Sequence, residues 1–343
     1  MSMFAVLLEK LQRREDLTVD EATGAMAEIM EGRAASSHIA GLLVGLAMKG
    51  ERPAEIVGLA RAMRLRATPL PRPAGAPDVF DTCGTGGDGS GTFNVSTAAA
   101  LVVAGCGVPV AKHGNRSVSS RCGSADVFEA LGVKVDAAPD VAARCLEEAG
   151  IAFLFAPTFH PSMRHAGPTR KELGIRTAFN LLGPLTNPAG AARQLVGVPR
   201  PELTELVARS LAMLGTTRAW VVHGADGLDE LSTTGYSKVS EYRDGAVNTF
   251  YVHPAEAGLP KASQADLLGG DAAVNAAIIR GIFDGATGAP RDIVLYNAGA
   301  ALLIAGRAAD LREGIAMAAD AIDSGRAGGV LDRLAQVSQG AGA

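Results

Sequence analysis

The residues best suited to chemistry lie in the glycine-dense stretch 79–97. Glycines stand at positions 84, 86, 87, 89 and 91, between the apolar pair Val79 and Phe80 and an apolar run over 98–104. We therefore expect a strand, a loop and the start of a helix. Glycine adopts positive φ and lets backbone N–H groups approach a ligand closely, and the positive end of a helix dipole favours negative charge. The stretch predicts a phosphate-binding loop.

This loop fits neither of the common phosphate motifs well. It lacks the Gly-Lys-Ser/Thr ending of a P-loop, and it matches the dinucleotide spacing only as Gly84, Gly86 and Gly89. On the glycines alone, a flexible loop without a ligand is therefore the alternative interpretation.

Two further loops follow expected strands and carry groups that complement an anion. The first runs over 112–124 and is rich in hydrogen-bond donors, and the second holds Asp226, Asp229 and Glu230. Ligands of parallel α/β sheets bind at the carboxyl ends of strands, and Mg²⁺ often joins phosphate to one or two carboxylates. The three loops together predict a polyphosphate bound with a divalent metal. Taken singly, these charged residues also fit a solvated surface.

The stretch 153–188 combines aromatic, proline and basic residues. It includes His160 and Arg170, and an apolar wall beside an arginine suits a flat organic acid, because arginine pairs bidentately with a carboxylate. A core segment followed by a surface helix is the equally good alternative. Nothing in the sequence brings a Ser/His/Asp or Cys/His set together for nucleophilic catalysis.

The elements that must position these residues form two groups. Residues 3–67 show apolar spacing typical of helices throughout, with a capping box from Thr18 to Glu21, and a proline-rich linker occupies 68–78. After the linker, strand and helix patterns alternate, which predicts a mostly parallel sheet with helices on both faces. We expect a small all-helical domain joined to a larger α/β domain.

The bulk composition excludes several functional classes. The chain has 343 residues and a net charge of −4, whereas a non-specific nucleic-acid binder is usually basic. Its four cysteines form no Cys-x-x-Cys pair, so we expect free thiols in a reducing compartment. No signal-peptide core or 18-residue apolar span is present. We expect a soluble, cytoplasmic protein without nucleic-acid or membrane partners.

Four blocks of the sequence resemble the anthranilate phosphoribosyltransferases of tryptophan biosynthesis. They cover 81–97, 112–131, 155–160 with 170–188, and 226–232, in family order and spacing. The resemblance implies transfer of the phosphoribosyl group from 5-phosphoribosyl 1-diphosphate to the amine of anthranilate, giving N-(5-phosphoribosyl)anthranilate and diphosphate, the second step from chorismate. It implies a fold similar to that of the class II nucleoside phosphorylases.

The same resemblance implies a domain division and a quaternary structure. The helical domain would consist of residues 1–67 with a returning segment at about 165–190, and the α/β domain of residues 78–164 and 191–343. Two copies of the chain would form a homodimer through the helical domain.

The resemblance also implies ligand contacts at particular residues. Phosphoribosyl diphosphate would contact Gly84, Gly87, Asp88, Thr92, Asn94, Val95, Ser96, Thr97, Lys112, His113, Gly114, Asn115, Arg116, Ser117, Val118, Ser119, Ser120 and Ser124. Anthranilate would contact Gly84, Asn115 and Arg170, with His113 and His160 along its path. Two Mg²⁺ ions per subunit would be held by Ser96 with Glu230 and by Asp229 with Glu230. An aromatic amine is neutral at pH 7, so no general base is assigned, and His113 is only a candidate for late proton removal.

Two alternative functions remain at this point. A nucleoside phosphorylase of the same fold would need neither the Arg170 block nor the pair Asp229 and Glu230. A non-catalytic, nucleic-acid-binding relative would need a basic surface and would bind DNA in a strongly salt-dependent way.

Overall fold

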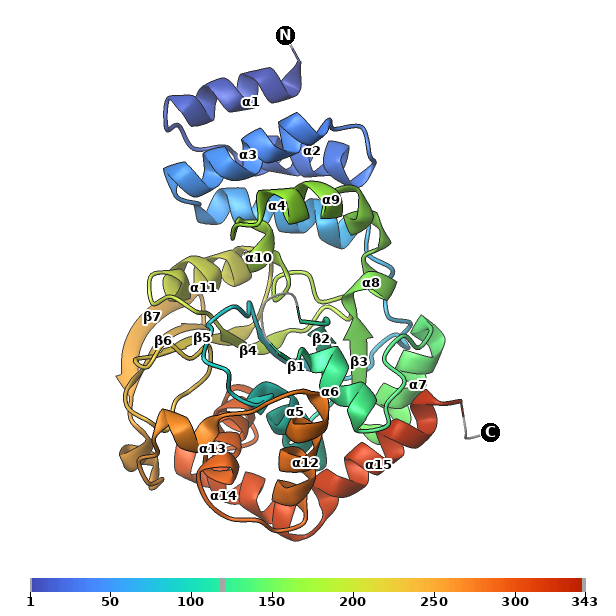
Figure 1. The fold of residues 1–343 in the computed structure, drawn as a ribbon, viewed down its shortest axis with the longest axis vertical. Coiled ribbons are helices and arrows are strands. Elements are labelled where there is room, and N and C mark those ends of the chain that lie inside the picture. Colours follow the sequence, from blue (N-terminus) through green and yellow to red (C-terminus); the bar gives the residue numbers. More distant parts are fainter. Residues whose placement is uncertain (1, 118–120, 341–343) are drawn as a thin grey trace.

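The computed structural model describes residues 2–117 and 121–340. One end of the molecule is built only from helices, and the other is a sheet covered by helices (Figure 1). The predicted fold class, a small helical domain with a larger α/β domain, is confirmed. Among the described residues, no helix is both long and apolar enough to span a bilayer.

Four amphipathic helices form the N-terminal helical unit. They are α1 (Met3–Gln12), α2 (Val19–Met30), α3 (Ser36–Lys49) and α4 (Pro53–Leu65). The predicted capping box is present, since the Thr18 hydroxyl accepts from the Glu21 N–H and the Glu21 carboxylate accepts from the Thr18 N–H. It satisfies two backbone donors that the first turn of α2 would otherwise leave without partners.

The buried carboxylate of Glu55 ties this unit together. Glu55 is fully buried and accepts from the backbone N–H groups of Leu17 at 2.9 Å and Arg52 at 2.8 Å. The Lys49 ammonium lies 3.1 Å away. One side chain therefore joins the loop before α2 to the start of α4.

We expect Glu55→Ala to lower the free energy of unfolding by about 3 kcal/mol, because it leaves the Leu17 and Arg52 N–H groups without their acceptor and leaves the buried Lys49 ammonium with Asp16 as its remaining carboxylate partner. Glu55→Gln keeps an acceptor oxygen and should lose less. Urea denaturation of the three proteins measures the difference. Equal stability of the unchanged chain and Glu55→Ala would contradict this account of the helical unit.

The larger unit is built on a seven-stranded sheet of order β3-β2-β1-β4-β5-β6-β7. The strands are β1 (Phe80–Gly84), β2 (Val110–Gly114), β3 (Ile151–Phe155), β4 (Arg193–Gly197), β5 (Arg218–Gly224), β6 (Ser237–Arg243) and β7 (Ala246–Val252). The first five strands run parallel, whereas β6 and β7 add an antiparallel hairpin at one edge. Parallel pairing brings the carboxyl ends of β1 to β5 to one edge of the sheet, where ligands of such sheets bind.

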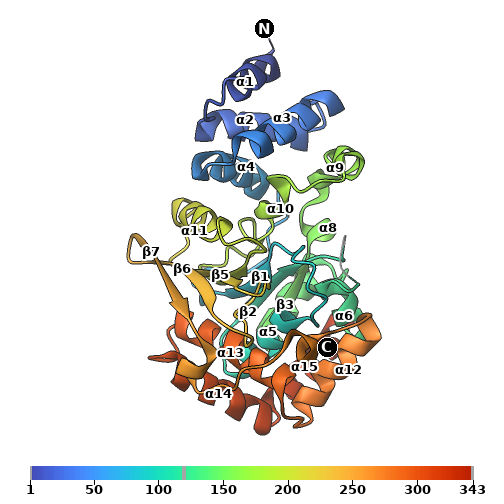
Figure 2. The ribbon, with the colours of Figure 1, turned by 60° about the vertical axis from the view of Figure 1, so that its left-hand side comes forward.

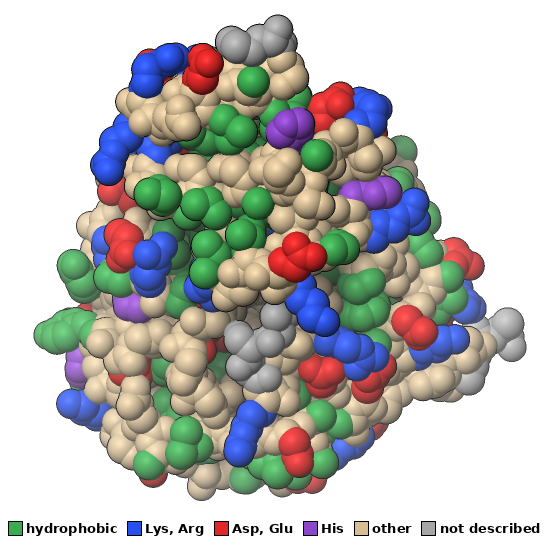
Figure 3. Space-filling model, turned by 45° about the horizontal axis from the view of Figure 1, so that its top comes forward, with side chains coloured by type: hydrophobic (Ala, Val, Ile, Leu, Met, Phe, Trp, Pro, Cys, Tyr) green, Lys and Arg blue, Asp and Glu red, His purple; other side chains and the backbone are tan. Residues whose placement is uncertain are grey.

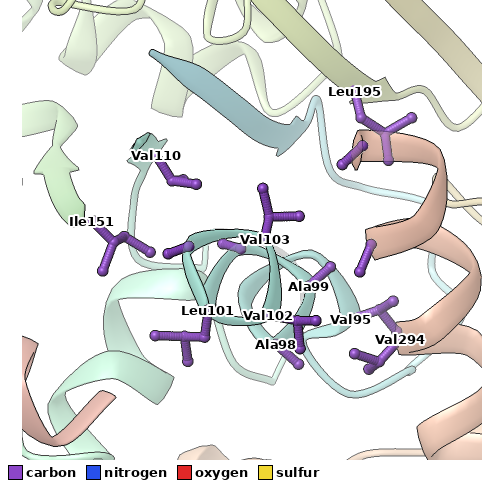
Figure 4. Close-up of a cluster of buried hydrophobic side chains, with 14 of the residues drawn as sticks. Val95, Ala98, Ala99, Leu101, Val102, Val103, Val110, Ile151, Leu195 and Val294 are labelled. Atoms are coloured by element: carbon purple, nitrogen blue, oxygen red, sulfur yellow. The ribbon is translucent and has the colours of Figure 1, made fainter. Parts of the chain in front are cut away.

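Helices cover both faces of the sheet (Figure 2). One face carries α5 (Val95–Gly105), α7 (Pro139–Ala149), α13 (Ala289–Ile304), α14 (Leu311–Asp323) and α15 (Arg326–Ser338). Helices α6 (Ser124–Ala130) and α12 (Ala272–Phe283) join the same core. Because α5 lies between the sheet and the outer helices, it is apolar on almost every side, as Figure 4 shows.

The other face of the sheet connects it to the helical unit. Helix α11 (Leu203–Met213) packs on this face and contacts α4. The segment after β3 forms α8 (Ala156–Phe159), a short 3₁₀ helix η1 (Pro161–His165), α9 (Gly167–Leu173) and α10 (Phe179–Leu182). Helix α9 contacts α3, and α10 contacts α4. Arg64 joins these parts by donating to the carbonyls of Leu185 at 2.7 Å and Leu214 at 3.1 Å.

Candidate active site

A cavity of about 650 Å³ lies between the helical unit and the carboxyl ends of the parallel strands. Its walls come from the glycine loop after β1, the loop after β2, the segment 156–184 and the acidic pair after β5. The predicted residues that line it are Gly84, Gly87, Asp88, Thr92, Asn94, Val95, Ser96, Lys112, His113, Gly114, Asn115, Arg116, Ser117, Ser124, His160, Arg170, Asp229 and Glu230. Four stretches distant in sequence therefore meet in one space.

Four predicted residues are not among the described residues that line the cavity. Thr97 is fully buried in α5, and its N–H donates to the Asn94 carbonyl at 3.1 Å, so it is not among the residues that line the cavity. Val118, Ser119 and Ser120 lie outside the described residues.

The glycine loop needs its glycines for two separate reasons. Gly86, Gly87, Gly89 and Gly91 all have positive φ, between 63° and 77°, where a side chain would strain the backbone. At Gly84 the reason is space, because a Cβ there would lie 2.6 Å from an Asp229 carboxylate oxygen. The loop is thus held close to the acidic pair.

The start of α5 has donors that face this site. Asn94 is the N-cap residue but makes no capping hydrogen bond, since its side chain is held by Asn275 and the Cys122 carbonyl instead. The Ser96 N–H donates to Glu230 Oε1 at 3.1 Å. A carboxylate therefore already occupies a position where a helix N-terminus favours negative charge.

Lys112 supplies a fixed cation beneath the loop. Its side chain is 2 % exposed and donates to the Thr82 carbonyl and, at 3.2 Å, to Ser96 Oγ. Buried Asp81 lies nearby and accepts from the His113 N–H and from Asn187 Nδ2 at 2.7 Å. Burial lowers the Lys112 pKa and Asp81 opposes that change. The network fixes the ammonium at the ends of β1 and β2.

Asp229 and Glu230 form a crowded acidic pair. Burial, and then the Asp88 charge, raise the pKa of Asp229 to about 7. Burial, and then Asp229, raise the pKa of Glu230 to about 8. Such carboxylates gain from a nearby cation, and their oxygens, with the Ser96 hydroxyl, are the ligands that Mg²⁺ prefers. The described residues contain no group of three or more His, Cys, Asp or Glu side chains arranged to hold a metal, so water or phosphate oxygens would complete its coordination.

Two neutral histidines form part of the opposite wall. The rings of His113 and His160 lie 5.0 Å apart, and His113 Nδ1 lies 3.0 Å from the Gly183 carbonyl. Within the described part of the chain, His113 Nε2 and both His160 nitrogens are buried without a hydrogen-bond partner. Burial lowers both pKa values, and burial with the neighbouring His113 brings that of His160 to about 3.

This burial predicts an acid-sensitive fold. A histidine titrates near pH 6.5 in the unfolded chain and near 3 at His160, so the unfolded state binds the extra proton between these values. The contribution of neutral His160 to stability is intact above about pH 6.5 and falls as the pH drops. The expected loss is about 2 kcal/mol at pH 5. Urea denaturation measures the free energy of unfolding at pH 7 and at pH 5. The decrease between the two should be smaller for His160→Phe than for the unchanged chain. Equal decreases would show that His160 is not the cause of the acid sensitivity.

Arg170 lies on an apolar wall in the same cavity. Its guanidinium is 5.1 Å from the centre of the Phe179 ring, and burial lowers its pKa. Met63 and Met163 line the cavity as well. This combination of a cation and a flat apolar surface suits an aromatic carboxylate.

Sequence reasoning missed other lining residues. They include Met63, Met163, Arg164, Arg176, Asn180 and Asn275. Arg176 and Asn180 lie in the block 170–188, so the family pattern was the available signal for them. Met63 has no such signal, because it looks like any core residue of α4.

Comparisons with known proteins identify the class. Residues 76–328 match the family model described as "Glycosyl transferase family, a/b domain", and residues 5–67 match "Glycosyl transferase family, helical bundle domain". The chain is therefore a glycosyltransferase built from these two parts.

The particular family follows from closer relatives. The chain is 56% identical over 332 residues to anthranilate phosphoribosyltransferase of Moorella thermoacetica, with 97% of each chain covered. The solved anthranilate phosphoribosyltransferase of Thermus thermophilus is 45% identical, with a TM-score of 0.90, and covers 97% of this chain and 99% of its own. The chain belongs to the anthranilate phosphoribosyltransferase family, which confirms the resemblance seen in the sequence.

A more distant relative has been solved with ligands. The Saccharomyces cerevisiae enzyme in complex with PRPP and Mg is 27% identical, with a TM-score of 0.89 and 98% of each chain covered. The same yeast enzyme in complex with 4-fluoroanthranilate gives 26% identity and a TM-score of 0.87, again with 98% of each chain covered.

Proposed function

We propose that the cavity is the active site in which this chain joins anthranilate to 5-phosphoribosyl 1-diphosphate. The observation that carries the proposal is that the cavity unites a glycine loop, a buried lysine, an acidic pair and an arginine on an apolar wall. A nucleoside phosphorylase would need neither Arg170 nor the acidic pair. The relatives' activity favours the transferase over the phosphorylase and over a nucleic-acid-binding protein.

The two ends of the cavity would bind the two substrates. The phosphate groups lie against the glycine loop, the start of α5 and Lys112, where backbone N–H groups and an ammonium are gathered. Anthranilate lies along Phe179 with its carboxylate toward Arg170. This arrangement directs the amine toward the ribose.

The chemistry depends on positioning and on electrostatics. The bond from the anomeric carbon to diphosphate breaks with its electron pair on the diphosphate, the carbon becomes oxocarbenium-like, and the neutral amine attacks it. Lys112 and the loop N–H groups stabilise the charge that grows on the leaving group. The amine releases one proton after attack, and His113 Nε2 is a neutral acceptor without a partner among the described residues.

Mg²⁺ would neutralise part of the diphosphate charge. Ser96, Asp229 and Glu230 offer the oxygen ligands, in the two sets Ser96 with Glu230 and Asp229 with Glu230. The yeast complex with PRPP and Mg supports use of this metal. Two ions per subunit remain our proposal.

The assembly and location are further parts of the proposal. The packing of α9 on α3 and of α10 on α4 supports a helical domain of residues 1–67 with the returning segment at about 165–190. Met3, Val6 and Met48 are exposed apolar side chains of that unit. Figure 3, in which the helical end of the molecule is turned forward, shows several hydrophobic side chains on this surface. These features support a homodimer through the helical domain. The cytoplasmic location stays a prediction from the sequence.

The experiment is to follow anthranilate fluorescence after mixing the protein with 5-phosphoribosyl 1-diphosphate, in Mg²⁺ or in EDTA. We expect a loss of fluorescence that requires both the diphosphate and Mg²⁺. No loss from folded protein would overturn the proposal, and phosphorolysis of nucleosides or salt-dependent DNA binding would then be measured instead.

A further inference from the structure

Arg176 lies over the glycine loop but is outside the ligand set that the family resemblance implied. It stands in the connection between α9 and α10 and lines the cavity together with Gly87, Asp88 and Asp229. Because α9 packs against α3, the arginine reaches the loop from the side of the helical unit. Gly87, Asp88 and Asp229, which line the cavity beside Arg176, belong to the α/β unit.

The contact between Arg176 and the loop is close. One guanidinium nitrogen, Nη1, lies 1.6 Å from the point that a Cβ would take on Gly87, and the guanidinium carbon lies 2.9 Å from that point. Gly87 has a φ of 77°. The guanidinium therefore occupies the space that a side chain at position 87 would fill, directly beside the backbone expected to hold phosphate.

Arg176 has no anion of its own within the described residues. No hydrogen bond or ion pair within 4.0 Å joins its guanidinium to another described group, although Asp229 and Asp88 are close enough to raise its pKa against the lowering by burial. Arg116 is different, because it is paired with Asp126 at 2.9 Å and Glu129 at 2.6 Å. Arg170 lies on the Phe179 ring. Among the described residues, Arg176 therefore lies directly against the glycine loop and has guanidinium N–H groups that donate to no other described group.

We propose that Arg176 binds the diphosphate group of 5-phosphoribosyl 1-diphosphate and stabilises it as the leaving group. A planar guanidinium pairs bidentately with phosphate oxygens, and the loop that would hold those oxygens lies against it. As the anomeric C–O bond breaks, the electron pair moves onto the diphosphate, and Arg176 donates hydrogen bonds to that growing charge without gaining or losing a proton. The assignment rests on the proposed function.

The geometry also gives Arg176 a second effect. It comes from the segment that carries Arg170, so one connection contacts both substrates: Arg170 faces anthranilate and Arg176 faces diphosphate. Binding of the diphosphate at Arg176 would fix the segment that orients anthranilate. The arginine is therefore expected to affect kcat as well as KM for the phosphoribosyl donor.

The test compares the unchanged chain with Arg176→Gln and Arg176→Lys. Arg209→Gln is the matched control, since Arg209 is exposed on α11 and pairs with Glu205, four residues earlier. Calorimetry with inorganic diphosphate and Mg²⁺ measures binding, and steady-state kinetics measures each substrate separately. Thermal unfolding reports whether each variant folds.

We expect Arg176→Gln to weaken diphosphate binding at least tenfold and to lower kcat/KM for the phosphoribosyl donor about 100-fold, while KM for anthranilate rises by a smaller factor. Arg176→Lys should recover part of the diphosphate affinity, because it keeps the charge but not the fork. Arg209→Gln should match the unchanged chain.

Three results would overturn the assignment. These are diphosphate affinity within twofold of the unchanged chain, a rise in KM for anthranilate alone, or equal losses in the Lys and Gln variants, which would indicate a structural role. The binding measurement needs no turnover. If the unchanged chain binds diphosphate but forms no phosphoribosylanthranilate, the proposed function fails while the role of Arg176 is still decided by calorimetry.

Discussion

The double substitution Asp229→Asn with Glu230→Gln is expected to lower kcat/KM by about 10³-fold and to remove the dependence of the rate on Mg²⁺. The amides keep the size of the side chains but lose the negative charge that a divalent cation needs. The Ser96 N–H now donates to Glu230, and the new amide at position 230 still offers it an oxygen. The start of α5 should therefore be little disturbed.

Titration of the rate with Mg²⁺ measures this effect. The matched control is Glu202→Gln with Glu205→Gln, which removes two carboxylates from the start of α11, where their ion pairs are with the exposed residues Arg200 and Arg209. The control should keep the Mg²⁺ dependence of the unchanged chain. If the site variant kept the rate of the unchanged chain at low Mg²⁺, Asp229 and Glu230 would not be metal ligands.

Arg170→Gln is the second substitution for which we expect a large effect, a rise in KM for anthranilate. Arg170 offers a bidentate partner for the anthranilate carboxylate and lies on the Phe179 ring. Loss of a charge-assisted pair in a partly buried site should raise KM for anthranilate by about 10- to 100-fold. KM for the phosphoribosyl donor should stay nearly constant, because the glycine loop and Lys112 are untouched.

Steady-state kinetics with each substrate varied in turn separates the two effects. Arg170→Lys should recover little, because an ammonium lacks the planar fork. The surface variant Arg209→Gln again controls for loss of one positive charge. An unchanged KM for anthranilate in Arg170→Gln would exclude Arg170 from the anthranilate site.

The sequence was most informative where local chemistry decides structure. The capping box at Thr18 and Glu21 needs only residues three apart, and it is present. The glycine loop follows β1 and leads into α5 as expected, because positive φ and a buried helix have clear local signatures. Parallel pairing then brings the loops after β1, β2 and β5 together without further information.

The sequence was least informative where distant segments meet. The approach of α9 to α3 and of α10 to α4 depends on surfaces more than 100 residues apart, and periodicity reports only which face of each helix is apolar. Met63 reaches the cavity for the same reason. Strand β7 shows little alternation of apolar and polar residues, because it lies at the edge of the sheet and most of its residues are not buried.

The central claim is that one cavity joins the two substrates, and the most direct test is the stoichiometry of the products. One reaction containing protein, Mg²⁺, anthranilate and 5-phosphoribosyl 1-diphosphate would be assayed for released diphosphate and, by mass spectrometry, for N-(5-phosphoribosyl)anthranilate. We predict equal amounts of both, formed only when both substrates are present. Diphosphate release that does not depend on anthranilate, or no phosphoribosylanthranilate from folded protein, would contradict the account.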